Sequence, residues 1–140
     1  MSATKKRVLF VCTGNRARSQ MAEGLLRQLA GERFDVFSAG TIPSGMSEMT
    51  IAAMEEIGID ISCQWSKSVD EYAGQMFDSV ITVCNSAREA CPVFPGEGER
   101  IHWDIEDPSD IEARGLPLKE AFRIARDDLR ARIERFARAN

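Results

Sequence analysis

A cysteine and an arginine near the start of the chain have the spacing of an oxyanion-binding catalytic loop. Cys12 ends an apolar run, and Arg18 and Ser19 open a segment with helical periodicity. A cysteine thiolate is a nucleophile, and a guanidinium can hold two oxygens of a tetrahedral oxyanion. Backbone N–H groups before a helix bind the same oxyanion. We therefore predict a nucleophile at Cys12 and an oxyanion-binding loop formed by Thr13, Gly14, Asn15, Arg16, Ala17 and Arg18.

The neighbouring residues fit this chemistry. The positive field that binds an anion also favours the thiolate form of Cys12, and Ser19 can donate a hydrogen bond to it. Asn15 suits a left-handed position that locks the loop. The alternative is that Cys12 is a buried cysteine at a strand end and Arg18 a surface residue, but the strand before, Gly14 inside and the helix after favour catalysis. Nucleotide binding has no support, because GxxxxGK[ST] and GxGxxG are absent.

The elements that position this loop follow from the apolar pattern. Short apolar runs rich in Val, Ile and Phe predict strands at residues 7–11 and 79–83. Alternation predicts a further strand at 34–39, and we expect a fourth at 100–103. Apolar residues spaced by three and four predict three helices. The first begins at Ser19, has Met21, Leu25 and Leu29 on one face and is capped by Gly31. The second spans 47–57 and is closed by Gly58, and the third runs from about Leu118 to the end. Segment 59–74 reads as loops and a short helix, and 104–110 as a turn.

This alternation predicts the fold class. Strands that alternate with helices give an α/β three-layer sandwich, with a four-stranded parallel sheet flanked by helices, and we expect residues 1–140 to form one domain. Ligands bind beyond the carboxyl ends of such strands. Cys12, Cys84 and the segment 104–107 each follow a predicted strand. We expect all three on one rim of the sheet.

Composition excludes several classes of function. The chain has 140 residues, a net charge of −4 and a pI near 5.1, and an acidic protein of this kind lacks the basic surface of a nucleic-acid binder. Residues 1–6 are polar, and no apolar run is long enough to span a bilayer. We therefore expect a cytoplasmic protein with no nucleic-acid or membrane partner, and we take a monomer as the default.

The other cysteines need an explanation, because a reducing cytoplasm disfavours a static disulfide framework. Six residues separate Cys84 from Cys91, and Ser86 with Glu89 forms a possible capping box. If this segment is helical, its end residues lie about 10 Å apart, whereas a disulfide needs Cα atoms about 4.4 to 6.8 Å apart. A bond between Cys84 and Cys91 would thus require unwinding.

Two other interpretations of this pair stay open. The pair can be two unrelated buried cysteines. A structural zinc site is disfavoured by the cysteine spacing and by the single histidine, His102, which lies inside a predicted strand and is expected to be structural.

The chain also resembles a known family. CTGNRARSQMAEG from Cys12, FSAG from Phe37, the Cys84 and Cys91 pair, and HWDIEDP from His102 are similar to the thioredoxin-coupled arsenate reductases with the low-molecular-weight tyrosine phosphatase fold. The resemblance covers nearly the whole chain and implies arsenate as the substrate. It also implies a relay in which Cys12 attacks arsenic, Cys84 attacks the adduct and Cys91 attacks Cys84. Thioredoxin then reduces the last disulfide as an external reductant, with no bound cofactor.

The resemblance places a general acid immediately before a proline, at Asp107. A bound anion opposite this carboxyl would favour its protonated form, which is the form that donates. Asp104 and Glu106 are the alternatives.

The family pattern differs at one position. Some relatives bind potassium beside the loop through residues that match Asn15, Glu23 and Ser38 and through an acid, whose place is taken here by Lys67. A lysine ammonium can occupy the position of that cation. We therefore predict that no metal is required.

Two further functions remain as alternatives. A tyrosine phosphatase would use the same loop, but Pro108, Ser109 and Asp110 follow the acid where the resemblance predicts aromatic residues that stack on phosphotyrosine. A phosphatase also has no use for the cysteine pair. The other alternative is a non-catalytic oxyanion or redox sensor. Cys63 matches no position of the relay, and we expect it to be a spectator.

Overall fold

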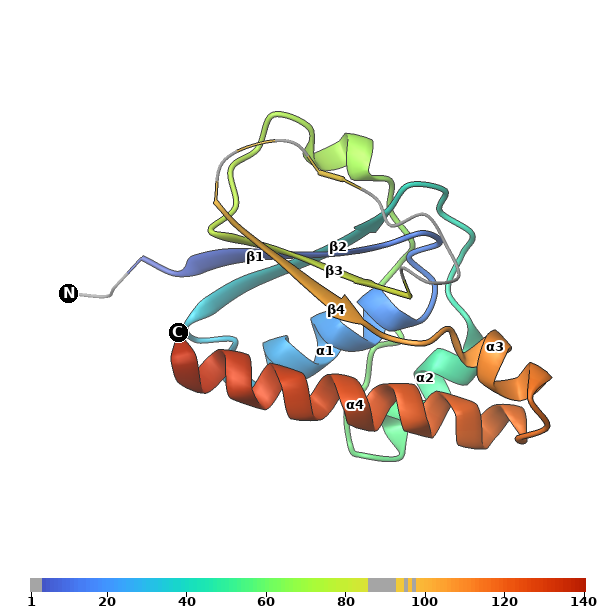
Figure 1. Cartoon of the computed structure of the whole chain (residues 1–140). Helices are drawn as coiled ribbons and strands as arrows, with labels where there is room; N and C mark the ends of the chain where they lie inside the picture. Colours follow the sequence, from blue (N-terminus) through green and yellow to red (C-terminus); the bar gives the residue numbers. More distant parts are fainter. Residues whose placement is uncertain (1–3, 86–92, 95, 97) are drawn as a thin grey trace.

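A four-stranded parallel sheet lies at the centre of the molecule (Figure 1). The structure is a computed structural model that describes residues 4–85, 93, 94, 96 and 98–140. The strands follow the order β2-β1-β3-β4 across the sheet. Their bounds are β1 (Lys6–Cys12), β2 (Phe34–Gly40), β3 (Ser79–Cys84) and β4 (Glu99–Asp104). All three strand pairs are parallel, so the carboxyl ends of the strands meet at one edge.

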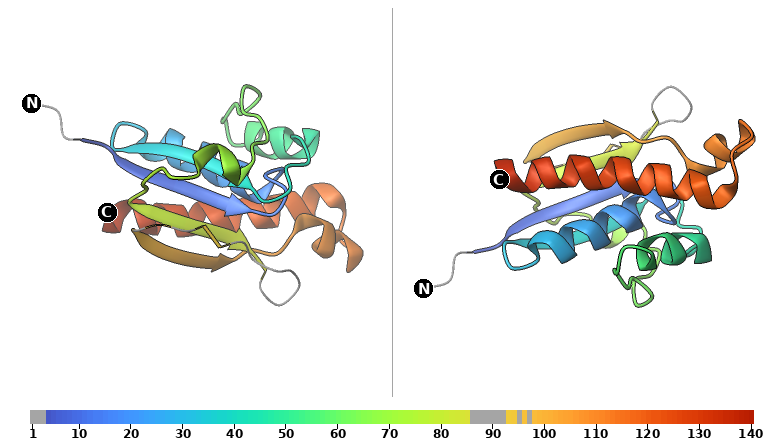
Figure 2. Two further views of the ribbon diagram at one scale, coloured as in Figure 1. Left: turned by 90° about the horizontal axis from the view of Figure 1, so that it is seen from above. Right: turned by 90° about the horizontal axis from the view of Figure 1, so that it is seen from below.

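Helices flank the sheet on both sides. The helices α1 (Arg18–Ala30), α2 (Glu48–Glu55) and α4 (Leu118–Ala139) lie on one face, and the 3-10 helix η1 (Val69–Tyr72) lies on the other (Figures 1 and 2). The short helix α3 (Pro108–Ala113) follows β4 and packs against α4. The predicted α/β sandwich with a four-stranded parallel sheet is confirmed. No helix in the described part of the chain has both the length and the apolar content that a membrane crossing requires.

The core explains why β1 reads as a continuous apolar run. Successive strand residues point to opposite faces. Val8 and Phe10 therefore pack with the helices, while Leu9 and Val11 pack under the segment that holds Phe77. These four side chains are fully buried, and each large apolar side chain buried in this way contributes about 1.5–3 kcal/mol. The central strand is therefore fixed on both faces.

The predicted core face of α1 is wrong at one position. Leu29 is 47% exposed, whereas Met21 and Leu25 are buried as predicted. A helix turns by about 100° per residue, so residues spaced by four drift around the axis until the third one leaves the buried face. Leu26 and Ala30 complete that face instead.

The segment 104–110, predicted as a turn, contains the start of α3. The Oδ1 atom of Asp107 accepts a hydrogen bond from the Ser109 N–H at 2.9 Å, and Pro108 occupies the first helical position. An aspartate cap followed by proline is a common start of a helix. The Asp-Pro pattern is visible in the sequence. The cap that it forms holds Asp107 beside the carboxyl edge of the sheet.

Candidate active site

The loop between β1 and α1 forms one wall of a cavity of about 240 Å³ at the carboxyl edge of the sheet. Residues that line it include Cys12, Thr13, Gly14, Arg16, Ala17 and Arg18, and Asp107 lines it from the start of α3. The structure therefore brings the predicted nucleophile, the predicted anion-binding loop and the predicted acid together. Asn15 is fully buried and lies behind the loop.

The sulfur of Cys12 lies among hydrogen-bond donors. The backbone N–H of Asn15 donates to Sγ at 3.2 Å, and Ser19 Oγ lies 2.8 Å from Sγ. Because Asn15 Nδ2 donates to Ser19 Oγ at 2.8 Å, the hydroxyl proton of Ser19 is available for the sulfur. Donors that point at a sulfur stabilise its charged form. The arrangement suits a cysteine that acts as a thiolate.

Asn15 holds the loop in a shape that ordinary residues avoid. Its φ of 45° lies in the left-handed region, which asparagine tolerates better than most residues. Its Nδ2 atom also donates to Ser38 Oγ at 2.9 Å, and its Oδ1 atom accepts from the Lys67 N–H at 2.8 Å. Gly40 of β2 lies directly beneath, where a Cβ atom would stand 2.5 Å from the carbonyl oxygen of Thr13. A residue with a side chain at this position would displace the loop.

Two buried glutamines support Asn15, and neither was predicted. Gln20 Nε2 lies 2.9 Å from Asn15 Oδ1 and 2.9 Å from the carbonyl oxygen of Trp65. Gln64 Nε2 donates to Gln20 Oε1 at 2.7 Å. Gln20 is fully buried. Periodicity does not reveal it, because Trp65 lies 45 positions away in the sequence and a sequence alone does not show such a contact.

Arg18 is held in place beside the cavity. Its side chain is 6% exposed, and Nη1 donates to the carbonyl oxygen of Ile105 at 3.0 Å. Its Nη2 atom lies 3.4 Å from Asp107 Oδ2. The guanidinium is therefore oriented before an anion binds, which lowers the cost of binding one.

The three candidate acids have different surroundings. Asp107 is 39% exposed and is the one that lines the cavity. Asp104 instead pairs with His102, and Glu106 pairs with Arg114. The geometry therefore supports Asp107 over the two alternatives.

A buried ion pair lies on the far side of the loop. Lys67 Nζ lies 3.7 Å from Glu23 Oε1 and donates to the carbonyl oxygen of Trp65 at 2.7 Å. Glu23 also accepts from Ser38 Oγ and from Arg27, each at 2.5 Å. Burial lowers the pKa of Lys67, and the carboxylate of Glu23 opposes that shift. The Lys67 ammonium thus lies beside Glu23, where the family resemblance implies a potassium ion in some relatives.

The remaining cysteines are distributed as follows. Cys84 ends β3, is fully buried and is disulfide-bonded. Cys12 and Cys63 are free thiols, and Cys63 is exposed. Cys91 and the possible capping box before it lie outside the described residues. Cys12 and Cys84 end the adjacent strands β1 and β3, so the expectation of a common rim is met for them and for Asp104.

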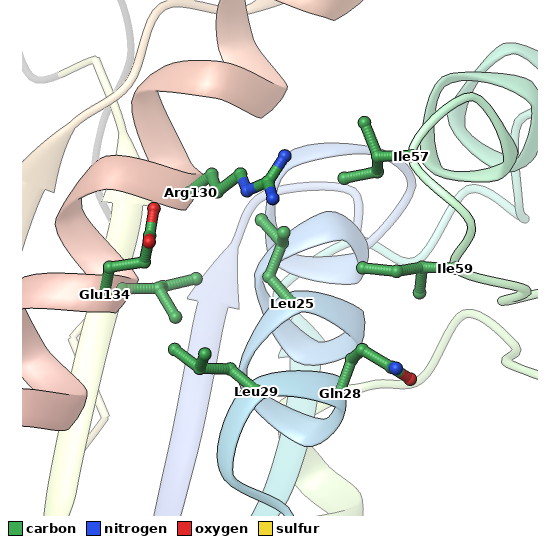
Figure 3. A pocket seen from close by; sticks show the side chains of 8 residues that line it. Leu25, Gln28, Leu29, Ile57, Ile59, Arg130 and Glu134 are labelled. Carbon is green, nitrogen blue, oxygen red and sulfur yellow. The ribbon is translucent and has the colours of Figure 1, made fainter.

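A larger cavity, of about 330 Å³, lies between α1, α4 and the chain after α2 (Figure 3). Leu25, Leu29, Ile57 and Ile59 point into it, with Arg130 at its side. It contains neither a nucleophile nor an anion-binding loop. The smaller cavity at Cys12 is therefore the candidate active site. Among the described residues, no three His, Cys, Asp or Glu side chains are grouped so that they could hold a metal ion.

Known proteins are similar to this chain in both sequence and fold. An arsenate reductase of Halalkalibacterium halodurans is 43% identical over 133 residues, which are 95% of this chain and 96% of that protein. A solved structure of an arsenate reductase in the phosphate binding state superposes with a TM-score of 0.79 at 36% identity, over 94% of this chain and 95% of that one. The thioredoxin-dependent arsenate reductase of Corynebacterium glutamicum is 26% identical with a TM-score of 0.73, over 99% of this chain and 63% of that one.

The profile of one family spans most of the chain. It is that of the low molecular weight phosphotyrosine protein phosphatases, and it matches residues 7–139. The match includes the loop after β1, Arg18 and Asp107. The chain belongs to the low molecular weight phosphotyrosine protein phosphatase family.

Proposed function

We propose that this protein reduces arsenate to arsenite, with Cys12 as the nucleophile and thioredoxin as the external reductant. The observation that carries the proposal is the free thiol of Cys12. It lies among hydrogen-bond donors beside a cavity of about 240 Å³, with Cys84 at the end of the adjacent strand. The similarity to proteins named arsenate reductase supports it.

The first step forms a bond between sulfur and arsenic. The thiolate of Cys12 attacks arsenic, and one arsenic–oxygen bond breaks. Asp107 donates a proton to the departing oxygen, which leaves as water. Arg18 and the amides of residues 13–18 hold the remaining oxygens as their charge changes.

The next steps move electrons to arsenic. Cys84 attacks the sulfur of Cys12, a disulfide forms, and the electron pair of the broken sulfur–arsenic bond reduces As(V) to As(III). Cys91 then attacks Cys84 and releases Cys12 as a thiolate. The dithiol of thioredoxin reduces the Cys84–Cys91 disulfide and becomes oxidised itself. This chemistry fits a reducing cytoplasm, a monomer and no bound cofactor.

The phosphatase alternative has less support. Asp107 caps a helix that begins Pro108, Ser109 and Asp110, so none of the residues directly after the acid is an aromatic one that would stack on phosphotyrosine. We expect at most weak phosphatase activity. A sensor that binds arsenate without turnover would also leave the relay without a purpose.

The product of the reaction tests the proposal. Arsenite is measured after the protein reacts with arsenate, thioredoxin, thioredoxin reductase and NADPH. We expect steady production by the wild type and by the matched control Cys63→Ser, and none by Cys12→Ser. Tight arsenate binding by the wild type without arsenite production would favour the sensor instead.

We further propose that Lys67 makes a metal ion unnecessary. Its ammonium neutralises Glu23 at the back of the loop, 3.7 Å from the carboxylate. Replacing potassium chloride with choline chloride should therefore leave the activity of the wild type unchanged. Lys67→Asp should make the melting temperature depend on potassium. A strict requirement of the wild type for potassium would contradict this proposal.

A further inference from the structure

Three side chains form a hydrogen-bonded line across β3 and β4, and the proposed mechanism uses none of them. Thr82 Oγ1 lies 2.7 Å from His102 Nδ1, and His102 Nε2 lies 2.8 Å from Asp104 Oδ1. His102 is the sole histidine of the chain. The side chains of His102 and Asp104 are 36% and 60% exposed, so packing alone does not account for their alignment.

This line lies beside Cys84. In the register of the sheet, Thr82 is opposite His102, and Cys84 is opposite Asp104. Residues two apart on a strand share a face, so Cys84 is on the face of Thr82 and His102. The intervening Val83 packs into the core on the helical side. Asp104 is therefore the cross-strand neighbour of Cys84, and His102 is its diagonal neighbour.

The line can gain or lose a proton without losing a hydrogen bond. With neutral His102, the hydroxyl of Thr82 donates to Nδ1, and the Nε2–H group donates to Asp104. With protonated His102, the Nδ1–H group donates to Thr82 Oγ1, whose own hydroxyl can turn to the carbonyl oxygen of Ile101 at 3.4 Å. Both states keep the histidine fully paired.

The charge of this line acts on Cys84. A carboxylate at the cross-strand position disfavours a thiolate there, because like charges repel. An imidazolium that pairs with Asp104 cancels that charge. The other charged group on this face of β4 is Arg100, which donates to the carbonyl oxygen of Gly96. β1 contributes the apolar Val11 next to Thr82 on this face.

We propose that His102 is a positioning residue for the cysteine relay: by neutralising Asp104, it sets the fraction of Cys84 that is present as the attacking thiolate. The proposal rests on the proposed function only in the role that it gives Cys84. A relay that must pass electrons through Cys84 gains from a side chain that compensates the charge of the neighbouring carboxylate.

The test measures the ionisation of Cys84 directly. In a reduced protein that carries Cys12→Ser, Cys63→Ser and Cys91→Ser, Cys84 is the sole thiol, and the ultraviolet absorbance of its thiolate is followed against pH. A protein with all four cysteines replaced by serine gives the baseline. We expect His102→Gln to lower the thiolate fraction at neutral pH by about three- to tenfold, and Asp104→Asn to raise it. The double variant should fall between the two.

Controls keep the result decisive. Glu99→Gln removes a charge from β4 on its other face, by strand alternation, and should leave the titration unchanged. His102→Asn gives a second variant if His102→Gln fails to fold. Equal titrations in all His102 and Asp104 variants, or a higher thiolate fraction in His102→Gln, would overturn the proposal. Because this measurement needs no arsenate, it stands apart from a failure of the proposed function.

Discussion

At the residue scale, the proposed nucleophile depends on side chains that do not line the cavity at Cys12. Asn15 supplies one donor to Cys12 through its backbone, and it holds Ser19 through its side chain. Asn15 is itself held by the buried Gln20. The reactivity of one sulfur atom therefore depends on a connected polar network, in which each buried group has a partner.

The orientation of Arg18 gives one prediction. Arg18→Lys replaces the planar guanidinium by a single ammonium group that cannot reach both Ile105 and Asp107. We therefore expect kcat/KM for arsenate to fall about a hundredfold. Arg16→Lys is the matched control, because the Arg16 side chain donates to the carbonyl oxygens of Ser44 and Gly45 and its amide stays in the loop. Steady-state kinetics compare the two, and equal losses would contradict the role given to Arg18.

The role of Gln20 gives a second prediction. Gln20→Leu keeps a similar shape but leaves the oxygens of Asn15 and Trp65 without its amide, so the free energy of unfolding should fall by about 1–3 kcal/mol. The value of kcat should fall as well, because the loop loses a support. Urea unfolding and arsenate kinetics measure both quantities. Gln28→Leu changes an exposed glutamine of the same helix and should affect neither.

At the scale of the elements, α3 gives Asp107 two tasks. One oxygen caps the helix by accepting from Ser109, and the other lies beside Arg18. The cap holds the carboxyl at the cavity through the fixed start of a helix, which a flexible loop could not do. Substitutions of Asp107 can therefore separate its role as a helix cap from its proposed role as a proton donor.

Asp107→Asn separates these two tasks. The amide oxygen still caps α3, but the side chain can no longer supply a carboxylic proton, so kcat should fall by about a hundredfold or more while the melting temperature stays close to that of the wild type. Asp107→Ala should lose activity and also about 1 kcal/mol of stability. If Asp107→Asn keeps full activity, another group supplies the proton.

Contacts between α2 and α4 predict how stability depends on pH. Hydrogen bonds from Arg123 and then Arg126 lower the pKa of Glu56 from 4.5 to about 2. The charged form is thus favoured in the folded state. Its contribution to stability is fully present above pH 4.5 and is lost as the pH falls toward 2.

Glu56→Gln removes this contribution. The difference in the free energy of unfolding between the wild type and Glu56→Gln should be largest near neutral pH and should shrink in acid. Glu55→Gln alters the neighbouring exposed carboxylate and should show no such pattern. Urea unfolding at several pH values gives the comparison, and a difference that grows in acid would refute the assignment.

At the scale of the whole molecule, the sequence was most informative where local signals and topology agree. Apolar runs such as that of β1 predicted the parallel sheet, and the parallel sheet predicted that Cys12, Cys84 and Asp104 share an edge. The sequence was least informative where distant residues meet. The contact of Gln20 with Trp65 is one that no periodicity reveals. Lys67 was expected near Glu23 only from the family resemblance, not from any local pattern. Leu29 shows a different limit. The helix was predicted correctly, but the spacing of four residues assigned Leu29 to the buried face, and its side chain is exposed.

The sheet also accounts for the order of the proposed chemistry. Cys12 ends the central strand beside the anion loop, and Cys84 ends the next strand. In the proposed mechanism, electrons therefore pass from Cys84 to arsenic through the sulfur of Cys12, and an external dithiol replaces them. In the proposed mechanism, the loop binds the oxyanion, and Cys84 makes the outcome reduction rather than simple hydrolysis.

The number of turnovers supported by Cys91→Ser tests this account most directly. NADPH oxidation is followed with arsenate, thioredoxin and thioredoxin reductase, and the arsenite formed is counted per protein molecule. We predict that the wild type and Cys63→Ser turn over many times, whereas Cys91→Ser forms about one arsenite per molecule and stops with Cys12 and Cys84 joined. Sustained turnover by Cys91→Ser at the rate of the wild type would contradict the relay.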